Sequence, residues 1–239
     1  MKKEKNIRSF TNDTNKYGGY VYTKNQKLSS YIANKHQTEI TLKLVKIANK
    51  EVIDVGCGDG TYTQEWYQVG KPKHVFGFDP SPGAIRSAKK NNKFKKYVSY
   101  KVGNVYKISK RKIYDIAIVR GVLHHLYEPE KGIREISKIA KKVILIEPNG
   151  YNPILKIIEK TSKYHIEHEE KSYFPFMVDK WIKKHSGTIK KRKYAAIVPF
   201  FCPDWAVRLL KRIEPFVEAT PLVRSLLCSN YYVVYENKL

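Results

Sequence analysis

VIDVGCGDG, residues 52–60, is the stretch that decides the fold of this chain. A short β-branched run ends at Gly56, Gly58 and Gly60, and this pattern predicts a strand that turns tightly into a helix. Glycines at such a turn let the backbone approach a ligand closely, and the amino terminus of the next helix favours negative charge. The stretch therefore predicts a nucleotide-like ligand site, with a plain strand-to-helix turn as the alternative.

Strand and helix patterns alternate from this stretch onward. The expected strands cover residues 51–55, 74–78, 97–102, 113–119 and 142–146, and the expected helices cover residues 62–69, 82–91 and 130–140. Such alternation is typical of a doubly wound α/β fold, in which helices cover both faces of a parallel sheet. A strand within residues 187–201 and another over residues 231–235 complete a mostly parallel, seven-stranded sheet with helical lid or insert elements.

Candidate site residues follow the expected strands at their carboxyl ends, where ligands bind on sheets of this kind. They are Asp54 with the glycine loop, Asp79, Asn104, Arg120 and Glu147. The spacing G-x-G-x-G differs from the G-x-G-x-x-G of dinucleotide sites, and Asp54 would repel a pyrophosphate but could accept hydrogen bonds from an ammonium group. A carboxylate at Asp79 suits a ribose diol. The two acids predict a ligand with a ribose and a cationic amino group, and without a diphosphate.

With these residues in place, the chain resembles the class I S-adenosylmethionine-dependent methyltransferases, and among them the branch with a type 11-like methyltransferase domain. The resemblance covers about residues 50–150 and includes, after VIDVGCGDG, the motifs VFGFDPS (75–81), GNV (103–105), YDIAIVRGVLHHL (114–126) and KVILIEPN (142–149). It implies a Rossmann-like methyltransferase fold. It also implies S-adenosyl-L-methionine as the cofactor.

The resemblance further implies which residues bind that cofactor, by their positions in the motifs. The glycine loop and Asp54 would line the methionine part, Asp79 would bind the ribose hydroxyls, and Asn104 would flank the adenine. Many relatives carry aspartate at the position of Asn104, whose amide can still donate to and accept from an adenine edge. The full implied set is Asp54, Gly56, Cys57, Gly58, Gly60, Asp79, Pro80, Asn104, Val105, Arg120 and Gly121, the last two passing near the sulfonium as backbone.

The implied reaction is an in-line displacement at the sulfonium methyl, in which the protein mainly aligns the acceptor and can remove a proton. His124 and His125 follow the fourth strand and are the candidate general bases, with His124 ahead, because imidazole titrates near neutral pH. The alternative is that one histidine orients the loop and the other caps the next turn. Residues 165–170 (HIEHEE) contain metal-ligand types, but a polar loop ahead of a helix is favoured, and we expect no bound metal.

We expect a single methyltransferase domain over residues 1–239, with a cofactor-binding core over residues 50–150. Residues 1–36 are expected to form an N-terminal arm or lid. Lid elements on the acceptor side are expected over residues 151–187 and 200–227. Three tyrosines of the arm are candidates for folding over the cofactor: Tyr17, Tyr20 and Tyr22.

Residues 205–216 carry an apolar stripe at helical spacing. This stripe predicts a core or lid helix that closes over the site, with a helix lying on a membrane surface as the alternative. No apolar run is long enough to span a membrane, and the charged amino terminus is unlike a signal peptide. The three cysteines lack the spacing of a disulfide framework or a zinc site, so we expect a cytoplasmic protein.

The chain carries a formal net charge of +24, with 46 lysine and arginine residues against 22 acids. A basic surface attracts phosphate, which raises nucleic acid or an anionic membrane as a partner. However, 37 of the 46 basic residues are lysine, whereas base and bidentate phosphate contacts favour arginine. A solvated lysine surface is therefore favoured over a nucleic-acid site, and peripheral contact with an anionic membrane stays open.

The expected function is methyl transfer to a small-molecule acceptor or to a glycan or lipid precursor. The region after Glu147 supports it, being large and aromatic enough to form an acceptor pocket. The alternatives are an RNA or protein methyltransferase, and a non-catalytic binding protein that keeps the cofactor fold. Against the RNA alternative, the fourth strand ends in VRGVLHHL, without the (Asp/Asn)-Pro-Pro-aromatic motif that exocyclic-amine nucleic-acid methyltransferases share.

Overall fold

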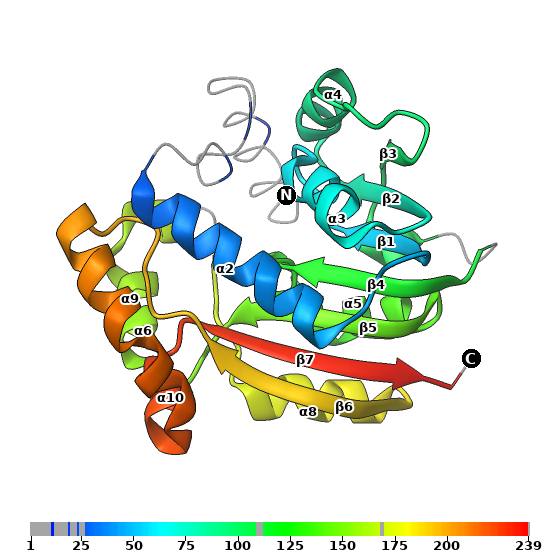
Figure 1. Ribbon diagram of the computed structural model, residues 1–239. Coiled ribbons are helices and arrows are strands. Elements are labelled where there is room, and N and C mark those ends of the chain that lie inside the picture. Colours follow the sequence, from blue (N-terminus) through cyan, green and yellow to red (C-terminus); the bar gives the residue numbers. More distant parts are fainter. Residues whose placement is uncertain are drawn as a thin grey trace.

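The computed structural model describes residues 27–108, 112–167 and 170–238, together with the isolated positions 11, 19 and 23. Its centre is a sheet with the strand order β3-β2-β1-β4-β5-β7-β6 (Figure 1). The strands of the described chain are β1 Glu51–Val55, β2 His74–Asp79, β3 Val98–Val102, β4 Tyr114–Arg120, β5 Ala140–Pro148, β6 Gly187–Ala195 and β7 Asn230–Asn237. β1 to β5 pair in parallel, and β7 runs antiparallel between β5 and β6. The predicted doubly wound, mostly parallel seven-stranded sheet is confirmed.

The strands form where apolar runs can be buried on both faces. In β1 and β4 nearly every residue is buried, as expected for central parallel strands covered by helices on each side. The strand predicted within residues 187–201 ends earlier, at Ala195. Ala196 has a φ of 66°, a left-handed conformation that breaks the extended backbone. The residues that follow are therefore free to turn toward the carboxyl edge of the sheet.

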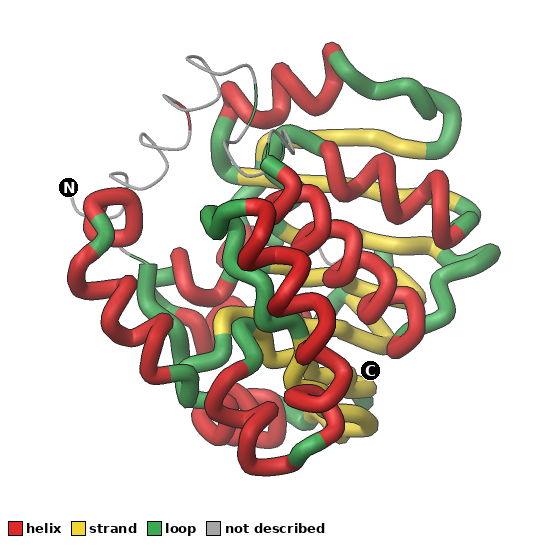
Figure 2. Tube along the Cα trace, turned by 60° about the vertical axis from the view of Figure 1, so that its left-hand side comes forward, coloured by secondary structure: helices red, strands yellow, loops and turns green. Residues whose placement is uncertain are grey.

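Helices cover both faces of the sheet, and Figure 2 shows helices lying across one of them. On one face, Ile136 of α5 and Val178 of α8 join the core formed with β4, β5 and β7. On the other face, Ile40 of α2, Trp66 of α3 and Ile85 of α4 pack against the opposite side of the strands. The helices are α2 Leu28–Leu44, α3 Thr61–Gly70, α4 Pro82–Lys90, α5 Pro129–Ser137, α6 Pro153–Thr161, α7 Lys163–Glu167, α8 Pro175–Lys184, α9 Asp204–Ala219 and α10 Pro221–Leu227, with short 3-10 turns η2 Val105–Lys107 and η3 Leu123–His125.

α2 brings a polar face to the carboxyl edge of the sheet. Residues 28–36 of the predicted arm form its first half. The hydroxyls of Ser29 and Ser30 both donate to the carbonyl of Phe200, at 2.9 Å each, which fastens α2 to the loop after β6. The lid role of the remaining arm stays a prediction, because its three candidate tyrosines lie outside the described residues: Tyr17, Tyr20 and Tyr22.

Two asparagines join α6 to the end of α10. Asn152 caps α6, because its side-chain oxygen accepts the backbone N–H of Ile154 at 2.9 Å. Its amide donates to the carbonyl of Leu227 at 3.0 Å, and the amide of Asn149 donates to the carbonyl of Cys228 at 2.9 Å.

None of the helices in the described part of the chain has the length and apolar content that a bilayer crossing requires.

Candidate active site

A cavity of about 710 Å³ opens at the carboxyl ends of the central strands. It is lined by every residue of the predicted cofactor set except Asp54 and Gly60, and also by His124 and His125. Pockets of this volume are typical of small-molecule and cofactor sites. The motifs, which are spread over residues 54–125, are therefore brought together at one edge of the sheet, as the strand-end rule predicts.

The glycine loop is held against the neighbouring strand by its backbone. The N–H groups of Gly56 and Cys57 both donate to the carbonyl of Phe78, at 2.9 and 3.0 Å. Gly56 has a φ of +71°, and a Cβ at this position would lie 2.6 Å from a methyl carbon of Val122. A side chain here would strain the backbone and collide with the segment after β4, so only glycine fits.

Asp79 is fixed between the glycine loop and the start of α4. One carboxylate oxygen accepts the N–H of Gly58 at 3.1 Å, and the other accepts the N–H of Ser81 at 2.8 Å. Burial raises the pKa of Asp79 to about 6, although both hydrogen bonds act in the opposite direction. A carboxylate has about four acceptor positions, so two remain for a pair of hydroxyl donors from the cavity.

Asp54 lies behind the loop and does not line the cavity. Its carboxylate accepts the hydroxyl of Thr63 at 2.6 Å, which joins the end of β1 to α3. Burial raises the pKa of Asp54 to about 6, and the hydrogen bond from Thr63 opposes this rise. Its contact with an ammonium group of the ligand stays a prediction.

Arg120 contributes its side chain to the site, which the sequence did not predict. Its guanidinium carbon lies 3.6 Å from the centre of the Tyr62 ring, within the range of a cation–π interaction. One of its nitrogens donates to the side-chain oxygen of Asn34 at 2.8 Å. Arg120 therefore ties β4 to α2 and α3, and all three of these residues line the cavity.

His124 and Glu147 form a buried pair, and of the two His124 lines the cavity. Nδ1 of His124 lies 2.8 Å from a carboxylate oxygen of Glu147. The same carboxylate accepts the backbone N–H groups of Val122 and Leu123, at 2.9 and 2.8 Å, which fixes it in place. Burial lowers the pKa of His124, but the charge and hydrogen bond of Glu147 outweigh it, and the net shift is upward. With Nδ1–H donating to Glu147, Nε2 is left to accept a proton.

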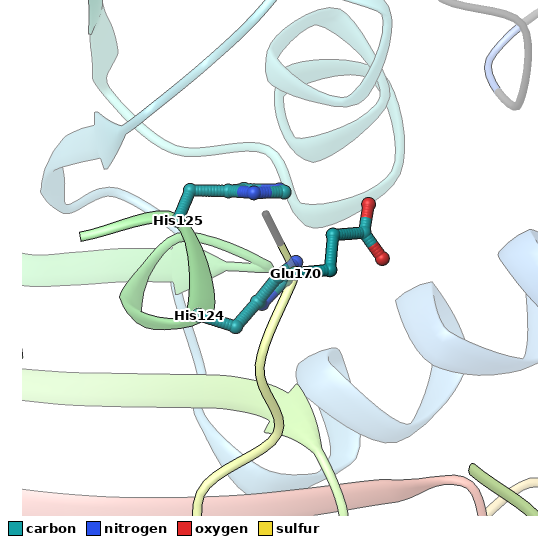
Figure 3. Close-up of side chains that lie close together, drawn as sticks. All are labelled: His124, His125 and Glu170. Carbon is teal, nitrogen blue, oxygen red and sulfur yellow. The ribbon is translucent and has the colours of Figure 1, made fainter. Parts of the chain in front are cut away.

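Figure 3 shows His125 and Glu170 beside His124. The two imidazole rings are 3.9 Å apart at their centres, and the ligand-type atoms of the three side chains lie within 4.8 Å of one another. Tetrahedral zinc with bonds of 2.0–2.1 Å would require separations of about 3.4 Å. Glu170 also lies 3.3 Å from His165. The expectation of no bound metal stays a prediction, and two members of the predicted HIEHEE group, His168 and Glu169, lie outside the described residues.

A second group of ligand-type side chains, His36, Glu214 and Glu218, serves the packing of α2 on α9. Nε2 of His36 lies 3.0 Å from Glu218. Glu218 also accepts the N–H of Ala196 at 3.0 Å, and Glu214 accepts the N–H of Ile197 at 3.1 Å. These contacts fix the loop after β6 between the two helices.

Apolar side chains from the region after β5 form part of the cavity wall. Ile154, Leu155 and Ile158 of α6 contribute to it, with the loop of residues 197–201 and Leu227 at the end of α10. Of these, α6, residues 200–201 and Leu227 fall within the predicted lid regions 151–187 and 200–227, whereas residues 197–199 lie between them. We call this part of the cavity its apolar half, although polar side chains such as Glu159 and Lys171 also line it, and we call the part built by β1 to β4 its polar half.

The prediction that the apolar stripe of residues 205–216 closes over the site is wrong. The residues that line the cavity include none of Asp204–Ala219, all of which are described. Only Val207 and Glu214 of this helix are buried, whereas Trp205 and Phe216 are exposed to solvent. Periodicity identified the stripe correctly, but α9 packs on the molecule through its other side.

A family model described as "Methyltransferase domain" matches residues 46–195. Among related sequences, an uncharacterized methyltransferase of Schizosaccharomyces pombe is 31% identical over 145 residues, covering 52% of this chain and 48% of that protein. The ubiquinone biosynthesis O-methyltransferase of Pelagibacter ubique is 30% identical over 99 residues, covering 40% of each chain. The tRNA U34 carboxymethyltransferase of Nautilia profundicola is 33% identical over 94 residues, covering 38% of this chain and 31% of that protein. The chain thus spans less than half the length of each of these relatives.

Two solved structures share the fold. The magnesium protoporphyrin IX methyltransferase of Synechocystis PCC 6803 with bound S-adenosylhomocysteine has a TM-score of 0.62 at 13% identity, covering 89% of this chain and 88% of that chain. A methyltransferase of Archaeoglobus fulgidus, described as dependent on S-adenosylmethionine, has a TM-score of 0.62 at 14% identity, covering 90% and 96%. The family match runs from before β1 to the last residue of β6, more than half of the chain. The predicted resemblance is confirmed, and the chain belongs to the methyltransferase-domain family.

Proposed function

We propose that this chain is an S-adenosylmethionine-dependent methyltransferase that acts on a small-molecule or lipid-precursor acceptor. The observation that carries the proposal is that the glycine loop and His124, which is paired with Glu147, line one cavity. The loop supplies a cofactor cradle, and His124 supplies a proton acceptor that can assist methyl transfer to a hydroxyl or amine.

The residues of the polar half fit this cofactor in kind and in position. Asp79 keeps acceptor positions for two ribose hydroxyls, and Gly56 and Gly58 of the loop line the same cavity. The side-chain oxygen of Asn104 accepts the N–H of Tyr106 at 2.9 Å, so its amide nitrogen is left to donate to an adenine ring nitrogen. When bound, the cofactor supplies an activated methyl group on a sulfonium.

His124 acts as the general base in this proposal. Glu147 holds the Nδ1–H tautomer, so Nε2 takes the proton of the acceptor as its oxygen or nitrogen attacks the methyl. The imidazolium that forms is stabilised by the buried carboxylate at 2.8 Å. A base of this kind contributes about 10²- to 10⁴-fold to a rate.

The apolar half of the cavity supports an acceptor with an apolar body. A relative named as a ubiquinone biosynthesis O-methyltransferase also supports a small-molecule acceptor. The runner-up is an RNA acceptor, favoured by the net charge of +24 and by the relative named for tRNA U34. Ile154, Leu155 and Ile158 of α6 and Leu227 of α10 suit an apolar acceptor better than a nucleotide, so we rank RNA second.

The test is titration calorimetry with S-adenosylmethionine and S-adenosylhomocysteine. We expect binding by the wild type and a loss of roughly a hundredfold or more in affinity for Asp79→Ala, because two hydrogen bonds to a charged group disappear. Asp115→Ala is the matched control, since this carboxylate bonds the N–H of Glu51 near the opposite edge of the sheet. Absence of binding by the wild type would overturn the proposal.

The acceptor class is tested with methyl-labelled S-adenosylmethionine offered with a metabolite and lipid extract or with bulk RNA. We expect label in the extract, and a strong loss of rate for His124→Asn at unchanged cofactor affinity. Label in RNA alone would replace the acceptor class with the runner-up.

A further inference from the structure

α9 carries its apolar stripe on the side that faces away from the fold. Val207 and Glu214, two turns apart, are buried against the molecule. Trp205, Leu209 and Phe216 lie on the opposite side of the helix at 3.6 residues per turn, and Trp205 and Phe216 are 70% and 74% exposed. α9 thus packs on the fold through Val207 and Glu214 and exposes Trp205 and Phe216 to solvent. Within the described part of the chain, its apolar face has no partner.

The exposed apolar residues continue into α10, which packs on α9 at the same end of the molecule (Figure 1). Leu222 is 78% exposed, and Leu226, one turn later, is also exposed. Single exposed apolar residues are ordinary, whereas a group on two adjoining helices marks an interaction site. We name this group the α9–α10 face: Trp205, Leu209, Ile213, Phe216, Leu222 and Leu226.

The two ends of the α9–α10 segment reach the mouth of the cavity. Phe201 lies three residues before α9, and Leu227 is the last residue of α10. Both side chains line the cavity and both are exposed, and Ile154 at the start of α6 shares these two properties. Apolar side chains therefore run from the outer surface into the apolar half of the cavity.

The charges beside the α9–α10 face are mainly positive. Arg208 and Arg212 are exposed on α9, whereas Glu214 is buried and Glu218 is paired with His36. The exposed acid of this helix is Asp204, in its first turn. Together with the net charge of +24, this arrangement is complementary to a negatively charged surface.

We propose that the α9–α10 face docks onto an anionic lipid membrane and that the cavity takes its acceptor from that membrane. The docking half of the proposal stands alone, and the acceptor half rests on the proposed function. Helices with Trp, Phe and Leu on one side and Arg beside them lie in the interface between headgroups and acyl chains. Because the other side of α9 stays packed on the fold, docking requires no unfolding. An acceptor with an apolar tail then enters through a mouth that is rimmed by apolar side chains.

The experiment is co-sedimentation of the protein with vesicles of phosphatidylcholine and phosphatidylglycerol, and with vesicles of phosphatidylcholine alone. We expect binding to the mixed vesicles that weakens with salt. The variant Trp205→Gln, Phe216→Gln, Leu222→Gln should bind at least roughly tenfold more weakly, because the inserted apolar area is lost. Glutamine keeps the helix propensity, and none of the three residues lines the cavity.

The matched control is Val69→Gln with Ile113→Gln, two exposed apolar residues near the opposite edge of the sheet, which should bind vesicles as the wild type does. Arg208→Gln with Arg212→Gln should weaken binding about fivefold per arginine and flatten the salt dependence. Equal binding by the triple variant and the wild type, or no binding by the wild type, would overturn the docking.

Sedimentation velocity on the same proteins measures their oligomeric state. It therefore tests whether a second copy of the chain, and not a membrane, covers the α9–α10 face. A wild-type dimer that the triple variant dissociates would also overturn the proposal, since a second copy would then cover the α9–α10 face. Calorimetry with S-adenosylmethionine on each variant keeps the two proposals apart. A protein that binds vesicles without binding this cofactor would retain the docking and lose the methyl transfer.

Discussion

Buried carboxylates govern the pH behaviour of the site at the scale of single residues. The pKa of Asp54 is raised to about 6 by burial, above its unfolded value of 3.8. The unfolded chain therefore releases this proton first as the pH rises. The stability that protonated Asp54 provides is complete below about pH 4 and is lost as the pH passes through about 6.

Asp54→Asn should accordingly raise the free energy of unfolding by about 1–2 kcal/mol at about pH 8, because the amide carries no buried charge and can still accept the Thr63 hydroxyl. Urea titration at about pH 8 and below about pH 4 measures the effect, which should vanish at the lower pH. Asp115→Asn is the control, and it should lower the free energy of unfolding at about pH 8. The reason is that the N–H of Glu51 and the Lys141 amine lower the pKa of Asp115 and so stabilise its charged form. A stability loss for Asp54→Asn at about pH 8 would contradict this account.

The pKa of His124 is also raised, but here the surroundings favour the charged form of the side chain, whereas burial of Asp54 favours the neutral form. The pKa of His124 is raised because Glu147 outweighs the effect of burial, so the imidazolium form stabilises the fold at acid pH and this stability is lost as the pH rises through the raised pKa. Proton NMR titration of the imidazole should give a midpoint above the usual value of about 6.5. Glu147→Gln should lower this midpoint, because the charge and hydrogen bond of Glu147 are lost while burial continues to lower the pKa of His124. If the titration midpoint of His124 were the same in Glu147→Gln as in the wild type, Glu147 would not be what raises the pKa of His124.

At the scale of elements, the apolar half of the cavity depends on how α6 is joined to α10. Asn152→Ala removes the cap of α6 and the hydrogen bond to Leu227, and it should lower the free energy of unfolding by about 2–3 kcal/mol. Urea unfolding measures the loss, and Asn91→Ala, at an exposed helix end, should change it by less than about 0.5 kcal/mol. If the two variants behaved alike, the contact between α6 and α10 would not hold the wall.

The elements that build the polar half were predictable, because their signals are local. A β-branched run followed by glycines defines β1, and a proline in the first turn marks the start of α4. The ends of β6 and the face of α9 were not predictable in the same way. The end of β6 depends on one left-handed residue, Ala196, and periodicity locates an apolar stripe without saying whether a neighbour covers it.

Side-chain contacts between residues that are distant in the sequence are the part of the site that the sequence could not predict. His124 was a predicted base, but its pairing with Glu147 joins residues 23 positions apart on two neighbouring strand ends. The contact of Arg120 with Tyr62 and Asn34 likewise needs three elements in place. Strand order, not motif spacing, creates these contacts.

At the scale of the whole molecule, the two halves of the cavity come from successive parts of the chain. The polar half is complete by β4, and the apolar half uses α6, the loop after β6 and α10. α2 connects them, because Asn34 bonds Arg120 while Ser29 and Ser30 hold Phe200. The residues proposed for the cofactor and those proposed for the acceptor are thus separate in sequence but line one cavity in space.

The position of β7 has a consequence for synthesis on the ribosome. β7 emerges last of the described strands, yet it lies between β5 and β6 and supplies the sheet pairing of β6. Until it arrives, the nascent chain carries an open edge on β5 and an unpaired β6, both of which can recruit strands from other chains. The sheet is therefore completed when β7 inserts between two strands that are already made, and not by stepwise addition of strands at one edge.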